Sequence, residues 1–504
     1  MKADLSRNSH DASKRYTSVR LQQGRPQLDS DWNEQADIFQ REIRERMFDA
    51  TGDGAPAGPR ENGFLITASG ADLRIGAGRY YVSGVSVENF VETSIRAQPD
   101  LPGYTAPDAA RAENDGVYLV YLEVRERVLS HLEDPALREV ALGGPDTAVR
   151  TQTLGQVKLL RIAAAPEDLD RDSQPAEWLA LMAGYGAGRL RASLVGGPPG
   201  TGEGFRLPEN YLYRVEIHAG GPTGVATYKW SRNNASFAAL WLDANDDVLV
   251  IKNSARDADQ SFSPGQWIEL IDEGRELRGE AGVFARVART DGDLIIIDPA
   301  SATGPFDIAA FPHGRRLVRP WDMTGAARRT TGESTLELEG GLQIAFDAPG
   351  GPDQYRPGDY WLIAARSVSK TIEWPRDTSG ESLFQPPRNG PPLLSRLAFA
   401  RLNGGVWSTI VDARTRFSTL ADIARQDHFI ENKLNRFGDT MTGTLNVEAD
   451  LNVALDASFR RSLRVETDLH VKGDFLVEGD VIARDTQHEP GDVRLGDQDE
   501  DAIT

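Results

Sequence analysis

The sequence predicts a mainly β, multidomain protein with β-sandwich or barrel-like domains, a few short helices and a C-terminal β-stalk built from a six-residue (hexad) repeat. Between residues 63 and 363, short alternating apolar runs are separated by glycine-rich turns, which is typical of antiparallel β structure. The chain has 504 residues. Because a single core stops growing at roughly 250 to 300 residues, several domains are expected. Near the C-terminus, apolar residues recur every six positions without a slip.

Changes in this pattern divide the chain into six segments. We expect an N-terminal strand and amphipathic helix in 1–60, β-rich domains in 61–195 and 205–410, a connecting helix in 415–437, the stalk in 438–484 and an acidic tail in 485–504. The Gly/Pro-rich segment Gly196–Gly204 separates the two β-rich parts, because it favours neither helix nor strand.

The first sixty residues combine a predicted strand with a predicted helix. Lys14–Gly24 alternates apolar and polar residues as a strand does, and Asp29–Asp31 offers good N-cap types before helical apolar spacing over Trp32–Phe48. Since an amphipathic helix near a terminus can bury its apolar face on a partner, Tyr16, Trp32 and Phe39 are the predicted docking residues. The alternative is that the helix packs on its own domain.

The β-rich parts contain strand signals at regular spacing. A meander is expected from residue 63 to 91, followed by longer strands at Val117–Val124 and Gln156–Ile162. Tyr211–Ile217 and Ala226–Trp230 surround a glycine-bearing loop, which predicts a hairpin. Further strands are predicted at Val248–Ile251, Trp267–Ile271, Leu294–Ile297, Leu336–Leu338, Leu342–Phe346 and Tyr360–Ile363.

The C-terminal repeat predicts self-association. Each unit reads as a three-residue, half-buried strand followed by a turn, and such a strand buries too little surface to be stable alone. The predicted oligomerisation residues are Leu445, Val447, Leu451, Val453, Phe459, Leu463, Val465, Leu469, Val471, Phe475, Val477 and Val481. A homotrimer is our first hypothesis. The alternatives are a two-sheet cap on the preceding domain and a monomeric solenoid.

Composition indicates which partners and which cellular compartment are expected. The formal net charge is −20, with 56 Lys and Arg against 76 Asp and Glu, and such a surface disfavours nucleic acid and acidic membranes. Neither an export signal nor a run of about 18 apolar residues is visible, so we expect no signal peptide and no membrane insertion. The absence of cysteine excludes disulfides and fits folding in a reducing cytoplasm.

The sequence predicts no catalytic, cofactor-binding or metal-binding residues. The seven histidines are scattered, and neither a nucleophile elbow nor a P-loop is present. Asp243–Asp247 is either a turn or a weak calcium loop. Five tryptophans offer either a sugar-binding surface or core residues: Trp230, Trp241, Trp267, Trp361 and Trp374. A glycoside-cleaving site made of two carboxylates stays possible, because the distance between two carboxylates cannot be read from the sequence.

Two resemblances can be named from particular segments. Gly438–Leu445, with the sequence GDTMTGTL, resembles a short repeat motif of phage tail-fibre proteins and lies where the hexads begin. The larger resemblance covers roughly residues 1 to 410 and is to a large domain family of unassigned activity whose members commonly occur alongside contractile injection systems. Its segments are Arg15–Gln35, Leu132–Thr147, Leu212–His218, Tyr228–Asn233 and Gly358–Ile363.

These resemblances imply an architectural function. The expected protein is a non-enzymatic subunit of a contractile injection system or phage-tail-like particle, assembled in the cytoplasm and contacting other tail or baseplate proteins. The particle would be released from the cell or attached to its envelope. The alternatives are a receptor- or glycan-binding fibre and a glycan-cleaving tailspike. The family supplies no established catalytic residues, so the resemblance transfers none to this chain.

Overall fold

The structure is a computed structural model of the chain, and it divides into two units, Met1–Gln426 and Asp427–Thr504. The residues it describes are 2–56, 62–144, 146–196, 204–252, 261–323, 328–329, 335–347, 350–351, 354–415, 457, 459, 462–467, 469–473, 476 and 478–479. The predicted connecting helix beyond residue 415, the motif at 438–445 and the acidic tail lie outside them. No strand is present among the described residues from 457 to 479. The first unit is mainly β and multidomain, as the sequence predicts.

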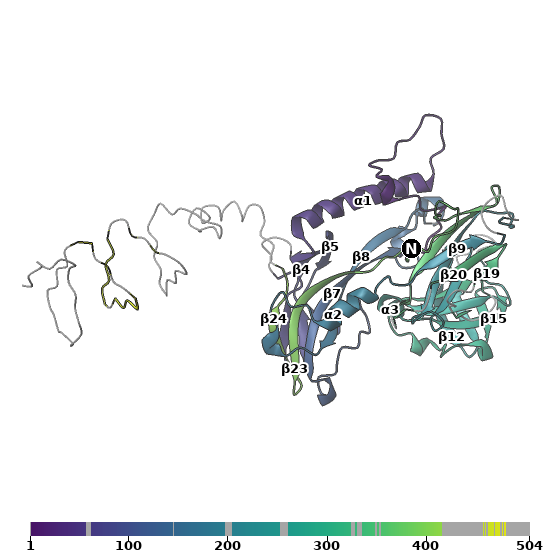
Figure 1. The fold of residues 1–504 in the computed structure, drawn as a ribbon. Coiled ribbons are helices and arrows are strands. Elements are labelled where there is room, and N and C mark those ends of the chain that lie inside the picture. The colour runs from purple at the N-terminus through teal and green to yellow at the C-terminus, as the bar shows by residue number, and fades with distance from the viewer. Residues whose placement is uncertain are drawn as a thin grey trace, which may run out of the picture. The chain divides into compact units, whose positions relative to one another are not determined.

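A four-stranded antiparallel sheet forms one part of the first unit (Figure 1). Its strands, in spatial order, are β24 (Val406–Asp412), β23 (Leu393–Asn403), β7 (Gly116–Leu129) and β8 (Arg150–Ile162). The sequence predicts β7 and β8 but not β23 and β24. Because β23 pairs with β7 along its whole length, the chain returns to its first sheet after building the second half. The predicted division into 61–195 and 205–410 therefore cuts through a sheet.

Small sheets and a helix cover the two faces of this sheet. The predicted meander forms two three-stranded sheets, whose apolar residues share a core with β7, β8 and β23. The first contains β1 (Gly54–Pro56), β4 (Gly78–Val82) and β5 (Val85–Asn89), and the second contains β2 (Ile66–Ser69), β3 (Asp72–Ile75) and β6 (Thr93–Ser94). Helix α2 (Ala176–Gly184) buries Trp178 against Tyr121 and Leu119 in a separate core cluster of β7.

A β-sandwich follows along the chain. The predicted hairpin is present as β10 (Tyr211–Ala219) and β11 (Thr227–Ser231), and the other strands of its sheet are β18 (Arg328–Arg329), β21 (Tyr360–Arg366) and β22 (Thr371–Glu373). The facing sheet contains β9 (Leu190–Leu194), β19 (Leu336–Glu339) and β20 (Leu342–Phe346). The two sheets share a core that includes Tyr213, Phe346 and Trp361.

Six strands close into a barrel that is inserted between β11 and β18. Their spatial order is β12 (Ala239–Asn245), β13 (Val248–Lys252), β16 (Leu294–Asp298), β15 (Val283–Asp291), β14 (Trp267–Asp272) and β17 (Arg316–Trp321), with β17 pairing back to β12. Trp241, Ile268 and Phe311 fill the interior. Helix α3 (Glu273–Arg278) directly follows β14.

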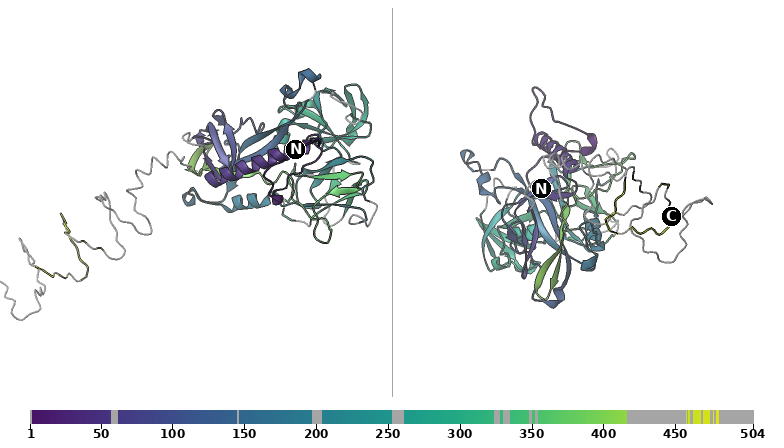
Figure 2. Two further views of the ribbon diagram at one scale, coloured as in Figure 1. Left: turned by 90° about the horizontal axis from the view of Figure 1, so that it is seen from above. Right: turned by 90° about the vertical axis from the view of Figure 1, so that its left-hand side faces the viewer.

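Helix α1 (Asp29–Thr51) lies along the surface of the first unit, next to β4 and β5 (Figures 1 and 2). It contains the predicted helix and extends it at both ends, and its N-cap is Leu28 rather than one of the predicted aspartates. A Cβ atom at Gly84 would lie 2.1 Å from the carbonyl oxygen of Arg44, so the β4–β5 turn supports the helix closely. The predicted strand at Lys14–Gly24 is wrong: apart from a 3-10 turn at Ala12–Lys14, the segment is irregular, because no strand among the described residues pairs with it.

Candidate functional site

The polar face of the β10–β11 hairpin is buried, and it builds the candidate site. Side chains alternate between the two faces of a strand. Tyr213, Val215 and Ile217 therefore enter the sandwich core, whereas Arg214, Glu216 and His218 face the opposite side. All three are at most 8% exposed. A fold that buries three ionisable groups on one strand must supply partners for them.

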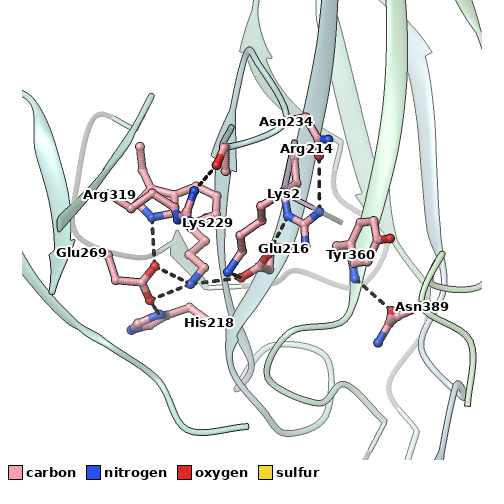
Figure 3. Close-up of polar contacts among 12 residues, drawn as sticks. Lys2, Arg214, Glu216, His218, Lys229, Asn234, Glu269, Arg319, Tyr360 and Asn389 are labelled. Carbon is pink, nitrogen blue, oxygen red and sulfur yellow. Dashed lines mark hydrogen bonds and ion pairs between the residues drawn. The ribbon is translucent and has the colours of Figure 1, made fainter. Parts of the chain in front are cut away.

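The partners form a buried ion network, defined here as Lys2, Arg214, Glu216, Lys229 and Glu269 (Figure 3). Lys229 on β11 stands directly opposite Glu216 in the register, and its Nζ lies 3.2 Å from Glu216 Oε1. The same Nζ donates to both carboxylate oxygens of Glu269 on β14, at 2.6 and 2.8 Å. The Lys229 side chain thus ties the sandwich to the barrel.

Lys2 brings the N-terminal segment into this network. Its Nζ lies 3.4 Å from Glu216 Oε1 and 3.1 Å from Glu276 Oε1 on α3. Asn234 Nδ2 donates to the carbonyl oxygen of Ala3 at 2.8 Å, and Ala3 is buried. Residues 2 and 3 are therefore part of the interior, held by polar contacts to β10, α3 and the segment after β11.

Opposite charges keep the buried carboxylates ionised. Burial alone would raise the pKa of Glu216, but Lys2, Arg214 and Lys229 outweigh it and hold that pKa well below its ordinary range. Burial opposes ionisation of Glu269 in the same way, and Lys229 with His218 lowers its pKa. Carboxylates in this state are suited to fixing cations in place rather than to exchanging a proton near neutral pH.

A cavity of about 490 Å³, here called the junction cavity, adjoins the network. Its lining residues come from the β7–β8 sheet, the sandwich, α3 and the N-terminal segment, and include Lys2, Arg125, Tyr185, Glu216 and Arg356. The cavity is thus built by segments far apart in the sequence.

A second buried carboxylate lies behind the cavity wall. Glu123 on β7 is fully buried, and its Oε2 accepts from Tyr185 Oη at 2.9 Å and lies 3.0 Å from Lys158 Nζ. Arg125 completes the group as a further ion pair of Glu123. Burial raises the pKa of Tyr185 to about 12, with the Glu123 charge acting in the same direction, so the phenol remains a donor. The Arg356 guanidinium stacks 3.6 Å above its ring.

The lowered pKa values predict acid destabilisation of the first unit. A carboxylate whose folded pKa lies below its ordinary value of 4.5 stabilises the fold above that pH, and this stability is lost as pH falls toward the folded pKa. Glu269→Gln removes one such group, so the slope of unfolding free energy against pH, between pH 3 and 4.5, should fall by up to about 1.4 kcal/mol per pH unit. Urea unfolding over this range measures it. Glu337→Gln, at a half-exposed carboxylate, should leave the slope unchanged.

The predicted docking residues lie on the surface. Tyr16, Trp32 and Phe39 are 57%, 69% and 54% exposed. On α1, Trp32, Phe39 and Ile43 fall within about 40° of one another at 100° per residue, and all three are exposed, as is the N-cap residue Leu28. Ile38 and Ser30, about 120° and 160° around the helix from the middle of this group, are buried. The helix therefore packs on the body through a face other than the one that carries the predicted docking residues.

The predicted oligomerisation residues are partly described. Phe459, Leu463, Val465, Leu469 and Val471 are between 42% and 59% exposed in the single chain. Leu445, Val447, Leu451, Val453, Phe475, Val477 and Val481 lie outside the described residues. The self-association of this segment stays a prediction.

The tryptophans serve mainly as core residues. Trp230, Trp241 and Trp361 are at most 5% exposed, and Trp267 and Trp374 pack partly buried against the sandwich core. A sugar-binding surface made of these five side chains is therefore wrong.

The acidic segment Asp243–Asp247 forms the end of the β12–β13 hairpin, and Asp246 takes the positive φ of 52° in its turn. The alternative of a turn is confirmed.

In the part of the chain that the structure describes, no group of three or more His, Asp or Glu side chains is arranged to hold a metal ion. Likewise, none of the described helices is long and apolar enough to span a membrane.

The sequence contains a signal for the ion network that the predictions do not use. Arg214, Glu216 and His218 alternate with apolar residues inside a predicted strand, and a strand with one apolar and one charged face is normally half exposed. The segments Leu212–His218 and Tyr228–Asn233, which carry the family resemblance, supply four of the residues at the site. A charged face within a resemblance segment is thus the pattern that could have located it.

Comparison with known proteins identifies a family for most of the chain. The model of a family described as "Family of unknown function (DUF6519)" matches residues 1–187 and 200–390. No curated protein matches the sequence. No solved structure matches it either.

Proposed function

The chain belongs to this family of unknown function, and we propose that it is a non-enzymatic structural component of a contractile injection system or phage-tail-like particle. In this proposal it contacts a tail or baseplate protein through α1 and forms homotrimers through its C-terminal repeat. It assembles in the cytoplasm, within a particle that is released or attached to the cell envelope.

The observation that carries the proposal is the exposed apolar stripe of α1, defined as Leu28, Trp32, Phe39 and Ile43. Each of these side chains is at least 47% exposed, although the helix has a separate face buried on the body. Such a stripe on a helix of 23 residues fits helix-in-groove recognition by a protein partner, in which anchors recur on one face. Tryptophan, which the stripe contains as Trp32, is also among the residues most enriched at binding hot spots.

The body holds this stripe in a fixed position. Gln40 Nε2 donates to Glu126 Oε1 on β7 at 2.9 Å, and Arg44 forms an ion pair with the same carboxylate. Gln35 Oε1 accepts from the backbone of Val19 at 2.8 Å, which ties the preceding segment to the helix. A rigid helix loses little conformational freedom on binding, so the stripe is suited to a stable contact.

The C-terminal repeat supports the self-associating part of the proposal. Five of its described apolar side chains are about half exposed in the single chain, and a homotrimer would bury them against their copies. The motif at Gly438–Leu445, which resembles tail-fibre repeats, precedes the first hexad.

The test replaces two residues of the stripe. Trp32→Asp with Phe39→Asp should leave the stability of the chain within about 0.5 kcal/mol, as for other exposed positions, and should remove the chain from the assembled particle fraction. Phe90→Asp, at an aromatic side chain that is 83% exposed elsewhere, is the matched control and should assemble normally. Normal assembly of the double variant would contradict docking through α1.

A further inference from the structure

The lining of the junction cavity is cationic although the chain as a whole is acidic. Nine Lys or Arg side chains line it against six Asp or Glu, an excess of three positive charges in a chain whose formal charge is −20. A cleft with low-dielectric walls and one dominant sign of charge concentrates ions of the opposite sign. The cavity is therefore a place where an anion is favoured.

The positions of two buried carboxylates strengthen the attraction of an anion to the cavity. Lys229 and Arg125 line the cavity, and two of their carboxylate partners, Glu269 and Glu123, do not, although Glu216, which also pairs with Lys229, does. Glu269 and Glu123 lie behind the wall and are at most 1% exposed. A group inside the cavity therefore faces Lys229 and Arg125 but not these two carboxylates.

A buried polar atom of the lining, Gln156 Oε1, points to a ligand with a hydroxyl group. Gln156 is fully buried, and its Nε2 donates at 2.8 Å to the carbonyl oxygens of both Asp100 and Leu277. Its orientation is thus fixed, and its Oε1 has no hydrogen-bond partner among the described residues. A buried polar atom left unpaired destabilises the fold, so binding of a ligand that pairs with Gln156 Oε1 is favoured.

From these features we infer that the junction cavity binds a small hydroxylated organic anion, of which a sugar acid is the typical form. The carboxylate of the ligand contacts the cations of the lining, and a hydroxyl of the ligand donates to Gln156 Oε1. The volume of about 490 Å³ lies within the roughly 300–1,000 Å³ of small-molecule pockets. The site is independent of the apolar stripe on α1 and of the C-terminal repeat.

Calorimetric titration of the full chain tests the inference at constant ionic strength. The probes are sodium glucuronate, glucose and sodium acetate. Glucuronate should bind saturably, and glucose and acetate should each bind at least about tenfold more weakly, because each lacks one of the two features that the lining recognises. Equal binding of glucuronate and acetate would overturn the requirement for hydroxyls. Absence of saturable glucuronate binding would overturn the whole inference.

A matched pair of variants and a second measurement locate the site. Arg356→Gln, which removes a cation from the lining, should weaken glucuronate binding at least about tenfold. Arg366→Gln, at a guanidinium paired with Glu373 outside the lining, should not. If Arg356→Gln does not fold, hydrogen exchange of the wild-type chain shows whether glucuronate binds in the junction cavity. Glucuronate should slow exchange in β10 and in 354–362 but not in β2, and uniform or distant protection would overturn the assignment.

Discussion

Lys229→Met is expected to be the most destabilising single substitution in the first unit. The variant keeps the length of the side chain but leaves Glu216 and Glu269 buried, at 3% and 1% exposure, without their shared cation. Breaking a buried ion pair by removing one partner costs about 3–5 kcal/mol. We therefore expect the free energy of unfolding of the full chain to fall by that amount. Urea unfolding followed by circular dichroism measures it.

The matched control is Lys252→Met on β13, which removes the charge of an exposed lysine and should change the unfolding free energy by no more than about 0.5 kcal/mol. The double variant Lys229→Met with Glu269→Gln should recover part of the loss, because the second substitution removes one stranded charge. Equal stability of Lys229→Met and the wild type would show that the network does not hold the sandwich and the barrel together.

The second large effect is expected at the C-terminal repeat. Leu463→Asp with Val465→Asp places two charges on the apolar side of one hexad, where the proposed trimer buries both residues. The wild-type chain should sediment at three times the mass of one chain, and the variant as a monomer, because two unpaired buried charges cost several kcal/mol each. Analytical ultracentrifugation of both full chains measures the difference.

Arg464→Asp is the control for this pair. Its side chain is 87% exposed and would point away from the apolar side of a short strand, so the variant should remain trimeric. A wild-type chain that is monomeric at micromolar concentration would instead favour the monomeric solenoid or the two-sheet cap.

The strands that the sequence predicts best are those with apolar residues on both faces or with a regular alternation of apolar and polar residues. Tyr211–Ile217 and Leu294–Ile297 are of this kind, and both are strands in the structure. β17 is not predicted, because Arg316, Arg319 and Pro320 interrupt its pattern, and proline in particular argues against a strand. Which strands pair across long separations depends on the tertiary fold. The return of β23 to β7 therefore has no local signal.

The candidate site is harder to predict than the fold. Lys2 is a charged residue near a terminus, where exposure is the usual expectation, and only the tertiary fold brings it to Glu216 on β10 and Glu276 on α3. The opposite error occurs at Lys14–Gly24, where the alternation of apolar and polar residues predicts a strand, but none of the described strands pairs with it. In α1 the spacing of Trp32, Phe39 and Ile43 predicts a helix correctly. It does not tell which side of the helix the body covers.

The central claim is that this chain is a subunit of a phage-tail-like particle, and isolation of such particles from cells that produce the chain tests it most directly. Particles collected by sedimentation would be probed with an antibody against the chain, which avoids any tag at either end. The account predicts that the chain co-purifies with sheath and tube proteins at a constant ratio, and that Trp32→Asp with Phe39→Asp abolishes this. Recovery of the wild-type chain only in the unsedimented fraction, while sheath and tube proteins sediment, would contradict it.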